Sequence, residues 1–245
     1  MKTPVGLNKT IISPSAMNNP GLTITEIRLA SKRATVILAN AGYSCCLVGS
    51  AAGYEHGITR IPNDVDILVM TEKEPVELKN LLVSEDSSFY WAKSTTNPQA
   101  CYRILWYRLP VAGDLDSPEK NCRIDLFTPG MIHLPRIHID RIVWSESGLP
   151  IMPLFPIILH KIQAWKAHLA STKPWAGVKQ ANDINDIKDL LRAAEKANVS
   201  LGSQNWLDPW FLEEAVEGVR EYIQQYLDTA DGWVKLGFRD VVMPP

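Results

Sequence analysis

The chain has few cysteines and no residue pattern that is typical of a zinc site. Four of its 245 residues are cysteines, Cys45, Cys46, Cys101 and Cys122, and no two of them are spaced as C-x-x-C. The five histidines form neither an HxxxH nor an HExxH pattern. Because Cys45 and Cys46 are adjacent in an apolar run, small buried residues are a better interpretation than a disulfide framework. We therefore expect free thiols in a reducing compartment.

Long hydrophobic runs and a large net charge are absent as well. No stretch reaches the roughly 18 consecutive apolar residues that a membrane span needs. Residues 1–20 lack the apolar core of a signal peptide, so we expect a cytoplasmic or nuclear protein with no membrane partner. The 25 basic and 27 acidic residues leave a net charge of -2. This balance argues against an extended contact with nucleic acid, although a local basic patch or a tRNA end stays compatible with it.

The composition and the order of patterns indicate an α+β protein. Hydrophobic residues make up 46% and charged residues 21%, which is ordinary for a globular chain with a sizeable core. Residues 1–22 are rich in Pro, Asn, Ser and Thr and predict an irregular arm. Strand-like patterns dominate residues 23–150, and helical periodicity follows in residues 151–245. We therefore expect a strand-containing domain followed by a helical C-terminal domain.

Periodicity and turn residues predict the individual elements. A helix begins near Thr23, with Glu26 in its first turn, and ends at Gly42. Strands are expected at residues 45–48, 65–70, 101–109, 122–127 and 141–145. Further helices are expected at residues 51–57, 75–83, 154–170, 181–197 and 209–228.

Gly49 and Ser50 stand between an apolar strand and a predicted short helix. A glycine here lets the backbone approach a phosphate closely. The exposed amides, the hydroxyl of Ser50 and the helix N-terminus all favour an anion. A Gly-Ser pair alone is also typical of an ordinary turn, so its interpretation depends on the next strand of the chain.

Two acids alternate on that next predicted strand. Since successive side chains of a strand point to opposite faces, Asp64 and Asp66 share one face, and the apolar residues Val65, Ile67 and Val69 share the other. Adjacent carboxylates repel each other unless a cation lies between them, and hard oxygen ligands suit Mg²⁺. An Asp-x-Asp alone is also typical of a solvated strand end. Together with Gly49 and Ser50, the pattern predicts a site for a nucleoside triphosphate and Mg²⁺ (or Mn²⁺).

These residues resemble a known family signature. Gly49-Ser50, followed by Arg60 and then by DVDI at residues 64–67, is similar to the first signature of polymerase-beta-like nucleotidyltransferases. The similarity is greatest to the branch that contains the toxins of abortive-infection (type IV) toxin–antitoxin systems. Residues 62–63, Pro-Asn, depart modestly from the small Ser/Thr-containing stretch usual there.

The resemblance spans residues 45–192 and has implications for fold and ligands. It implies a mixed β-sheet with flanking helices, followed by a helical C-terminal region. It also implies that Gly49, Ser50 and Arg60 bind an NTP such as ATP.

The family has a third acid on an adjacent strand, and Asp125 is the candidate. It alternates with Ile124 and Leu126 and therefore points away from their face. An unpaired carboxylate in the middle of a strand is costly, and a shared metal would relieve that cost. One alternative is a salt bridge, for instance to an arginine of the preceding strand, and the other is that Asp140 supplies the third acid. The arginines of that preceding strand are Arg103 and Arg108.

The resemblance implies a two-metal mechanism. Asp64 and Asp66 would hold both ions. Asp125 would act on the acceptor side as a metal ligand, and its use as a base is left open.

One lysine falls inside the apolar stripe of the predicted helix at residues 154–170. A lysine on a buried face needs an anionic partner or a route to solvent. Lys161 matches a lysine that the toxin-like family is proposed to place against the nucleotide. The alternative is that Lys161 extends along the stripe into solvent.

Asp183 lies on the apolar side of the next predicted helix, and Asp186 follows it three residues later. The family shows a basic residue and then Asp-x-x-Asp at this place, so the resemblance implies a nucleotide-binding role for Asp183. Asn182 replaces the usual Lys or Arg. The alternative is that acids in a first turn merely complement the helix dipole.

The sequence thus predicts a metal-dependent nucleotidyltransferase, which moves a nucleoside monophosphate from an NTP to an acceptor hydroxyl. The acceptor could be a small molecule, a tRNA end or a protein. The alternative is an inactive protein of the same fold that binds nucleotide or a protein partner, and the presence of all three acids favours the enzyme. The C-terminal aromatic residues are predicted to be core rather than a ligand platform: Trp206, Trp210, Tyr222, Tyr226 and Trp233.

Overall fold

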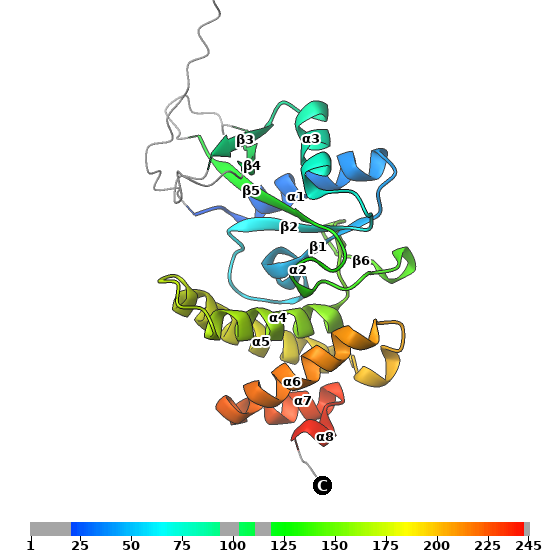
Figure 1. The fold of residues 1–245 in the computed structure, drawn as a ribbon, viewed down its shortest axis with the longest axis vertical. Helices are drawn as coiled ribbons and strands as arrows, with labels where there is room; N and C mark the ends of the chain where they lie inside the picture. The colour runs from blue at the N-terminus through cyan, green and yellow to red at the C-terminus, as the bar shows by residue number, and fades with distance from the viewer. Residues whose placement is uncertain (1–20, 94–102, 111–118, 243–245) are drawn as a thin grey trace, which may run out of the picture.

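The computed structural model describes residues 21–93, 103–110 and 119–242 (Figure 1). Within these residues a seven-stranded mixed sheet has the order β3-β4-β5-β2-β1-β7-β6. The strands are β1 (Cys45–Val48), β2 (Asp64–Val69), β3 (Phe89–Lys93), β4 (Arg103–Arg108), β5 (Asn121–Phe127), β6 (Val143–Trp144) and β7 (Pro150–Ile151). The sheet in the first part of the chain and the helices in the second confirm the predicted α+β class.

The helices flank the sheet or follow it. They are α1 (Ile24–Asn40), α2 (Gly49–His56), α3 (Pro75–Glu85), α4 (Leu154–Leu169), α5 (Ala176–Lys196), α6 (Pro209–Gln225), α7 (Ala230–Leu236) and α8 (Arg239–Val242). Short 3-10 turns are η1 (Met131–His133), η2 (Ile139–Arg141), η3 (Leu201–Ser203) and η4 (Leu227–Thr229). Figure 1 shows α4 and α5 beneath the sheet and α6 to α8 beyond them.

Helix α1 begins and ends where the sequence predicts. The side chain of Thr23 accepts a hydrogen bond from the backbone of Glu26, whose carboxylate accepts one from the backbone of Thr23. This reciprocal cap explains the start of the helix. Beyond its end, Gly42 adopts a φ of 84°, which glycine permits at low cost. The helix buries Ala30 and Ala34 and packs against β1, β2 and β5.

Two features of the sheet are absent from the sequence-based prediction. β3 is a five-residue strand at one end of the sheet order, and its alternation is obscured because it carries aromatic residues on both faces. β7 is two residues long and exists through the parallel pairing of Ile151 with Leu47 of β1. The predicted strand at residues 141–145 shortens to β6. Whether such a short segment forms a strand depends on its pairing partners elsewhere in the chain. The local periodicity of the sequence carries no information about these partners.

The proposed domain boundary between residues 150 and 151 falls inside β7. The division into two domains stays a prediction. Residues 1–20 of the predicted arm lie outside the described part of the chain, as does Cys101. Cys45, Cys46 and Cys122 are free and buried, as expected. No helix among the described residues is both long and apolar enough to cross a membrane.

The helical part has an aromatic core. The rings of Trp165 and Tyr222 meet edge to face, with 5.0 Å between their centroids, and Trp233 is fully buried beside them. The core prediction is therefore confirmed for Tyr222 and Trp233. It is wrong for Trp210, which is 38% exposed.

Candidate functional site

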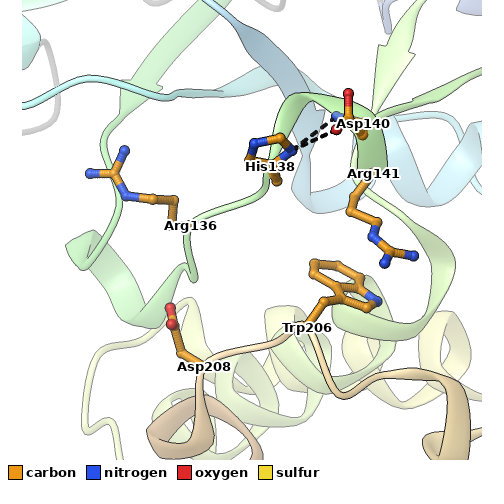
Figure 2. A pocket seen from close by; sticks show the side chains of 6 residues that line it. All are labelled: Arg136, His138, Asp140, Arg141, Trp206 and Asp208. Atoms are coloured by element: carbon orange, nitrogen blue, oxygen red, sulfur yellow. Dashed lines mark hydrogen bonds and ion pairs between the residues drawn. The ribbon is translucent and has the colours of Figure 1, made fainter.

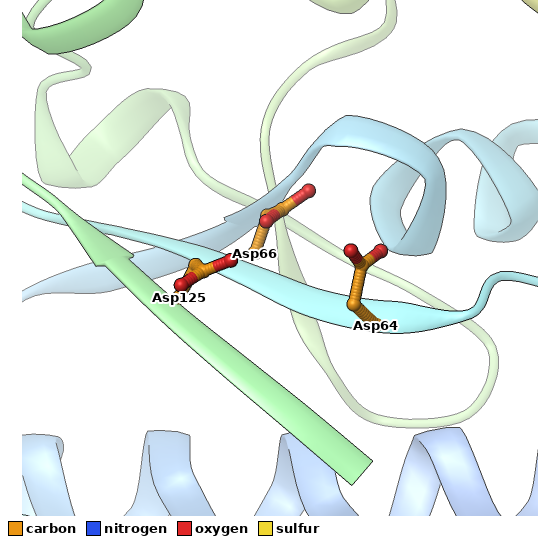
Figure 3. Close-up of side chains that lie close together, drawn as sticks. All are labelled: Asp64, Asp66 and Asp125. Carbon is orange, nitrogen blue, oxygen red and sulfur yellow. The ribbon is translucent and has the colours of Figure 1, made fainter. Parts of the chain in front are cut away.

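Three carboxylates converge on one face of the sheet (Figure 3). β2 and β5 run parallel with Asp66 opposite Asp125, and Asp64 lies two residues earlier on the same face. One oxygen from each of these acids lies within 4.8 Å of the other two. The neighbouring Val65 and Ile124 are fully buried on the opposite face, so slipping either strand by one residue would bury charge. Core packing therefore specifies the register that gathers the acids.

The electrostatics of this cluster are compatible with a bound cation. Burial raises the pKa of Asp66 well above its usual range, and the charges of Asp64 and Asp125 raise it further. Carboxylate oxygens are the hard ligands that Mg²⁺ and Mn²⁺ prefer. The donor set of Asp64, Asp66 and Asp125 therefore suits such an ion.

Asp125 also contacts two cations. Nη2 of Arg123 lies 2.6 Å from one of its oxygens and Nζ of Lys79 lies 3.8 Å from the other. Among the described residues these are its ion-pair partners, so Asp125 does form salt bridges, as the alternative interpretation expects, but with Arg123 and Lys79 rather than with Arg103 or Arg108. Its role as a metal ligand stays a prediction. Lys79 comes from α3, and its burial lowers its pKa against the attraction of Asp125. The sequence pattern did not reveal Lys79, because a single lysine on a helix carries no signal of its own.

Gly49 occupies the turn from β1 into α2. It has a φ of 60°, and a Cβ atom at this position would overlap Oδ2 of Asp66. α2 begins at Gly49 itself, two residues earlier than predicted. The sequence analysis assigns Gly49 a role in letting a phosphate approach the backbone. The structure adds a second reason for a glycine at this position, because the missing side chain makes room for the carboxylate of Asp66.

Ser50 joins a partly buried polar network that lies next to this turn. Arg60 donates to both carboxylate oxygens of Asp186, at 2.8 and 2.7 Å, and also to Oγ of Ser50. Nζ of Lys161 lies 2.7 Å from Asp186 and 3.4 Å from Oγ of Ser50. Asp186 is 1% exposed. The predicted residues Ser50, Arg60 and Lys161 are thus brought together, and Asp186 is the residue that joins them.

Lys161 and Asp183 correct two sequence-based alternatives. Lys161 is 6% exposed, so it does not extend into solvent. Its partners include Asp183, whose other oxygen lies 2.6 Å from Nδ1 of His168. Because α5 begins at Ala176, Asp183 and Asp186 lie beyond its first turn, and the helix-dipole alternative is wrong. The contact of Lys161 and Asp183 with a nucleotide stays a prediction.

A separate cavity of about 450 Å³ contains the remaining candidate acid (Figure 2). Asp140 lines it and pairs with Nδ1 of His138 at 3.1 Å. In the same cavity, Cζ of the Arg141 guanidinium lies 5.5 Å from the centroid of the Trp206 ring. Asp140 does not belong to the acid cluster, so it does not replace Asp125 as the third acid.

Comparison with known proteins supports the fold. No family model matches the sequence, and no curated protein matches it. The crystal structure of an antigenic nucleotidyltransferase-like protein from Paracoccidioides brasiliensis is similar, with a TM-score of 0.61 and 16% identity over 86% of this chain and 93% of that chain. The chain therefore shares the fold of a nucleotidyltransferase-like protein.

Two further solved structures align at lower scores. JHP933 from Helicobacter pylori has a TM-score of 0.49 and 13% identity over 87% of this chain and 82% of that chain. The antibiotic-resistance factor ANT(2'')-Ia has a TM-score of 0.42 and 9% identity over 84% of this chain and 96% of that chain.

Proposed function

We propose that this protein is a metal-dependent nucleotidyltransferase that moves a nucleoside monophosphate from an NTP to an acceptor hydroxyl. The observation that carries the proposal is the pairing of Asp66 with Asp125 across two parallel strands, with Asp64 on the same face. Three carboxylates so close together repel one another, and a shared cation would relieve this repulsion. The nucleotidyltransferase-like fold supports the same conclusion.

The acids would bind the metal, and the glycine turn would bind the phosphates. Asp64, Asp66 and Asp125 would hold Mg²⁺ (or Mn²⁺), which when bound lowers the pKa of an acceptor hydroxyl and offsets triphosphate charge. The amide at Gly49 and the hydroxyl of Ser50 would bind the phosphates.

The reaction is a substitution at the α-phosphorus. The acceptor oxygen forms a bond to this phosphorus while the bond to pyrophosphate breaks, and pyrophosphate leaves with the electron pair. The acceptor proton passes to Asp125 or to solvent.

The cations beside Ser50 would position the triphosphate. Arg60 and Lys161 already point toward the Ser50 hydroxyl, and charge-assisted hydrogen bonds to phosphate are strong. Asp183 would orient Lys161, since it contacts Nζ at 3.3 Å. We also propose that the chain belongs with the toxin-like branch, on the strength of Gly49-Ser50, Arg60 and the Asp-x-Asp.

The test is transfer of label from each α-labelled NTP, in Mg²⁺ or Mn²⁺, to components of a cell extract. We expect transfer that Asp64→Ala, Asp66→Ala and Asp125→Ala each abolish. Asp140→Ala is the matched control, because Asp140 is 79% exposed at its side chain and lies outside the acid cluster.

The outcomes separate the enzyme from its alternatives. Calorimetry that shows metal-dependent NTP binding without any transfer would favour an inactive nucleotide-binding protein. Neither transfer nor metal-dependent NTP binding would contradict the proposal altogether.

A further inference from the structure

The two sides of the acid cluster differ in charge balance. On the Ser50 side, Arg60 and Lys161 are matched by buried carboxylates of α5, Asp183 and Asp186. On the Asp125 side, Arg123 and Lys79 share one carboxylate. Within the described residues no other carboxylate lies within 4.0 Å of either cation. Two cations thus share one carboxylate on the acceptor side, and a metal ion on Asp125 would add further positive charge there.

The positions of these cations suit contact with a bound molecule. The side chain of Lys79 is 16% exposed and that of Arg123 is 44% exposed, and both reach the same acid. A guanidinium exposed in this way can bind a phosphate through two parallel hydrogen bonds.

The same face of the sheet continues outward with aromatic and cationic residues. Trp106 of β4 lies directly opposite Arg123 of β5, and Tyr90 of β3 lies opposite Trp106. Arg108, two residues along β4, places its guanidinium 5.1 Å from the ring centroid of Tyr90. Arginines among aromatic rings are typical of surfaces that bind phosphate groups and stack flat rings.

We propose that Lys79 and Arg123 make the acceptor side selective for a molecule that carries a phosphate near its reacting hydroxyl. The proposal rests on the proposed function and names the acceptor class of that same site. A polycationic amino sugar would place its ammonium groups against Lys79, Arg123 and Arg108, and like charges in such positions exclude a ligand. The phosphate could belong to a phosphorylated small alcohol or to the 3′ end of an RNA.

The test is calorimetry on the full chain with Mn²⁺ and a non-reactive NTP analogue bound. The probes are glycerol 3-phosphate, an RNA trinucleotide with a free 3′-hydroxyl, uncharged glycerol, and kanamycin as a polycationic amino sugar. We expect at least one phosphate-bearing probe to bind about tenfold or more tighter than glycerol and kanamycin. Tighter binding of the trinucleotide than of glycerol 3-phosphate would identify a nucleic-acid end, and similar binding of the two would identify a small phosphorylated alcohol.

Substitutions of Lys79 and Arg123 test whether these two cations cause the selectivity. Lys79→Gln and Arg123→Gln should each weaken the phosphate-bearing probe by about tenfold and the NTP analogue by much less, while Lys79→Arg retains binding of the probe. Lys32→Gln, an exposed lysine of α1, is the control. The unmodified protein tests the selectivity by itself if a variant fails to fold.

Three results would overturn the inference while leaving nucleotide binding intact. They are tightest binding of kanamycin, no binding of either phosphate-bearing probe, and equal weakening of probe and NTP analogue in the Lys79 and Arg123 variants. If the unmodified protein binds no NTP analogue with Mn²⁺, the proposed nucleotidyl transfer fails, and the inference falls with it for that separate reason.

Discussion

Gly49 leaves no room for a Cβ atom beside the carboxylate of Asp66, so the turn into α2 and the acid on β2 form one unit. The strand pairing explains this close approach, because Val48 of β1 lies opposite Asp66 in the antiparallel register. The residue after Val48 must therefore pass the carboxylate without a side chain. The Gly-Ser turn and the Asp-x-Asp depend on each other sterically as well as chemically.

We expect Gly49→Ala to damage this unit. The new Cβ would overlap Asp66, and a φ of 60° is strained for alanine. The free energy of unfolding should fall by about 1–3 kcal/mol, and metal-dependent NTP binding should be lost. Chemical denaturation and calorimetry measure the two effects. Gly177→Ala in α5 is the matched control, since a Cβ there meets nothing within 4 Å. Equal behaviour of the two variants would contradict the steric argument.

Asp66→Asn should stabilise the metal-free protein while it removes metal binding. Asp64 and Asp125 repel the Asp66 carboxylate, and a neutral amide relieves this repulsion by about 1 kcal/mol. Thermal unfolding with and without Mn²⁺ checks both parts. The unmodified protein should gain Tm with the ion and the variant should not. A Tm that Mn²⁺ raises equally in both proteins would count against the cluster as a metal site.

Asp186→Ala should be far more destabilising than the loss of an exposed acid. Asp186 is 1% exposed and pairs with both Arg60 and Lys161, so its removal leaves two cations without their shared partner. The expected loss in the free energy of unfolding is about 3–5 kcal/mol. Asp228→Ala removes an exposed partner of Lys188 and should cost far less, because solvent screens an exposed ion pair. Urea denaturation measures the free energy of unfolding of both variants. Similar losses in the two would refute the structural role of Asp186.

Stability should fall between pH 7 and pH 5 because of His160. Burial lowers its pKa from 6.5 to about 4, and its Nε2 donates to the carbonyl of Ile132. The unfolded chain takes up a proton below pH 6.5 whereas the folded one does not, so the stabilisation is complete above pH 6.5 and is lost as the pH falls toward 4. The loss at pH 5 is about 2 kcal/mol. His160→Gln should lack this part of the pH dependence in denaturation curves, and an unchanged curve would contradict the assignment.

Local pattern was sufficient for much of the fold. The capping pair Thr23 and Glu26, the apolar run of β1, and the alternation around Asp66 each predict an element that the structure confirms. These signals are short in range, because capping and side-chain alternation involve neighbours along the chain. The start of α5 was placed too late, since Trp175 provides no side-chain cap that a sequence would reveal.

The sequence by itself determined that Asp64, Asp66 and Asp125 would each stand on a strand, facing away from apolar neighbours. The tertiary structure decided that β2 and β5 are adjacent and parallel, which brings the three acids together. It also brought Lys79 to Asp125 and Asp186 to Arg60. Such pairings join residues far apart in the chain, and they depend on how whole elements pack their buried faces, which the local period of a sequence does not encode.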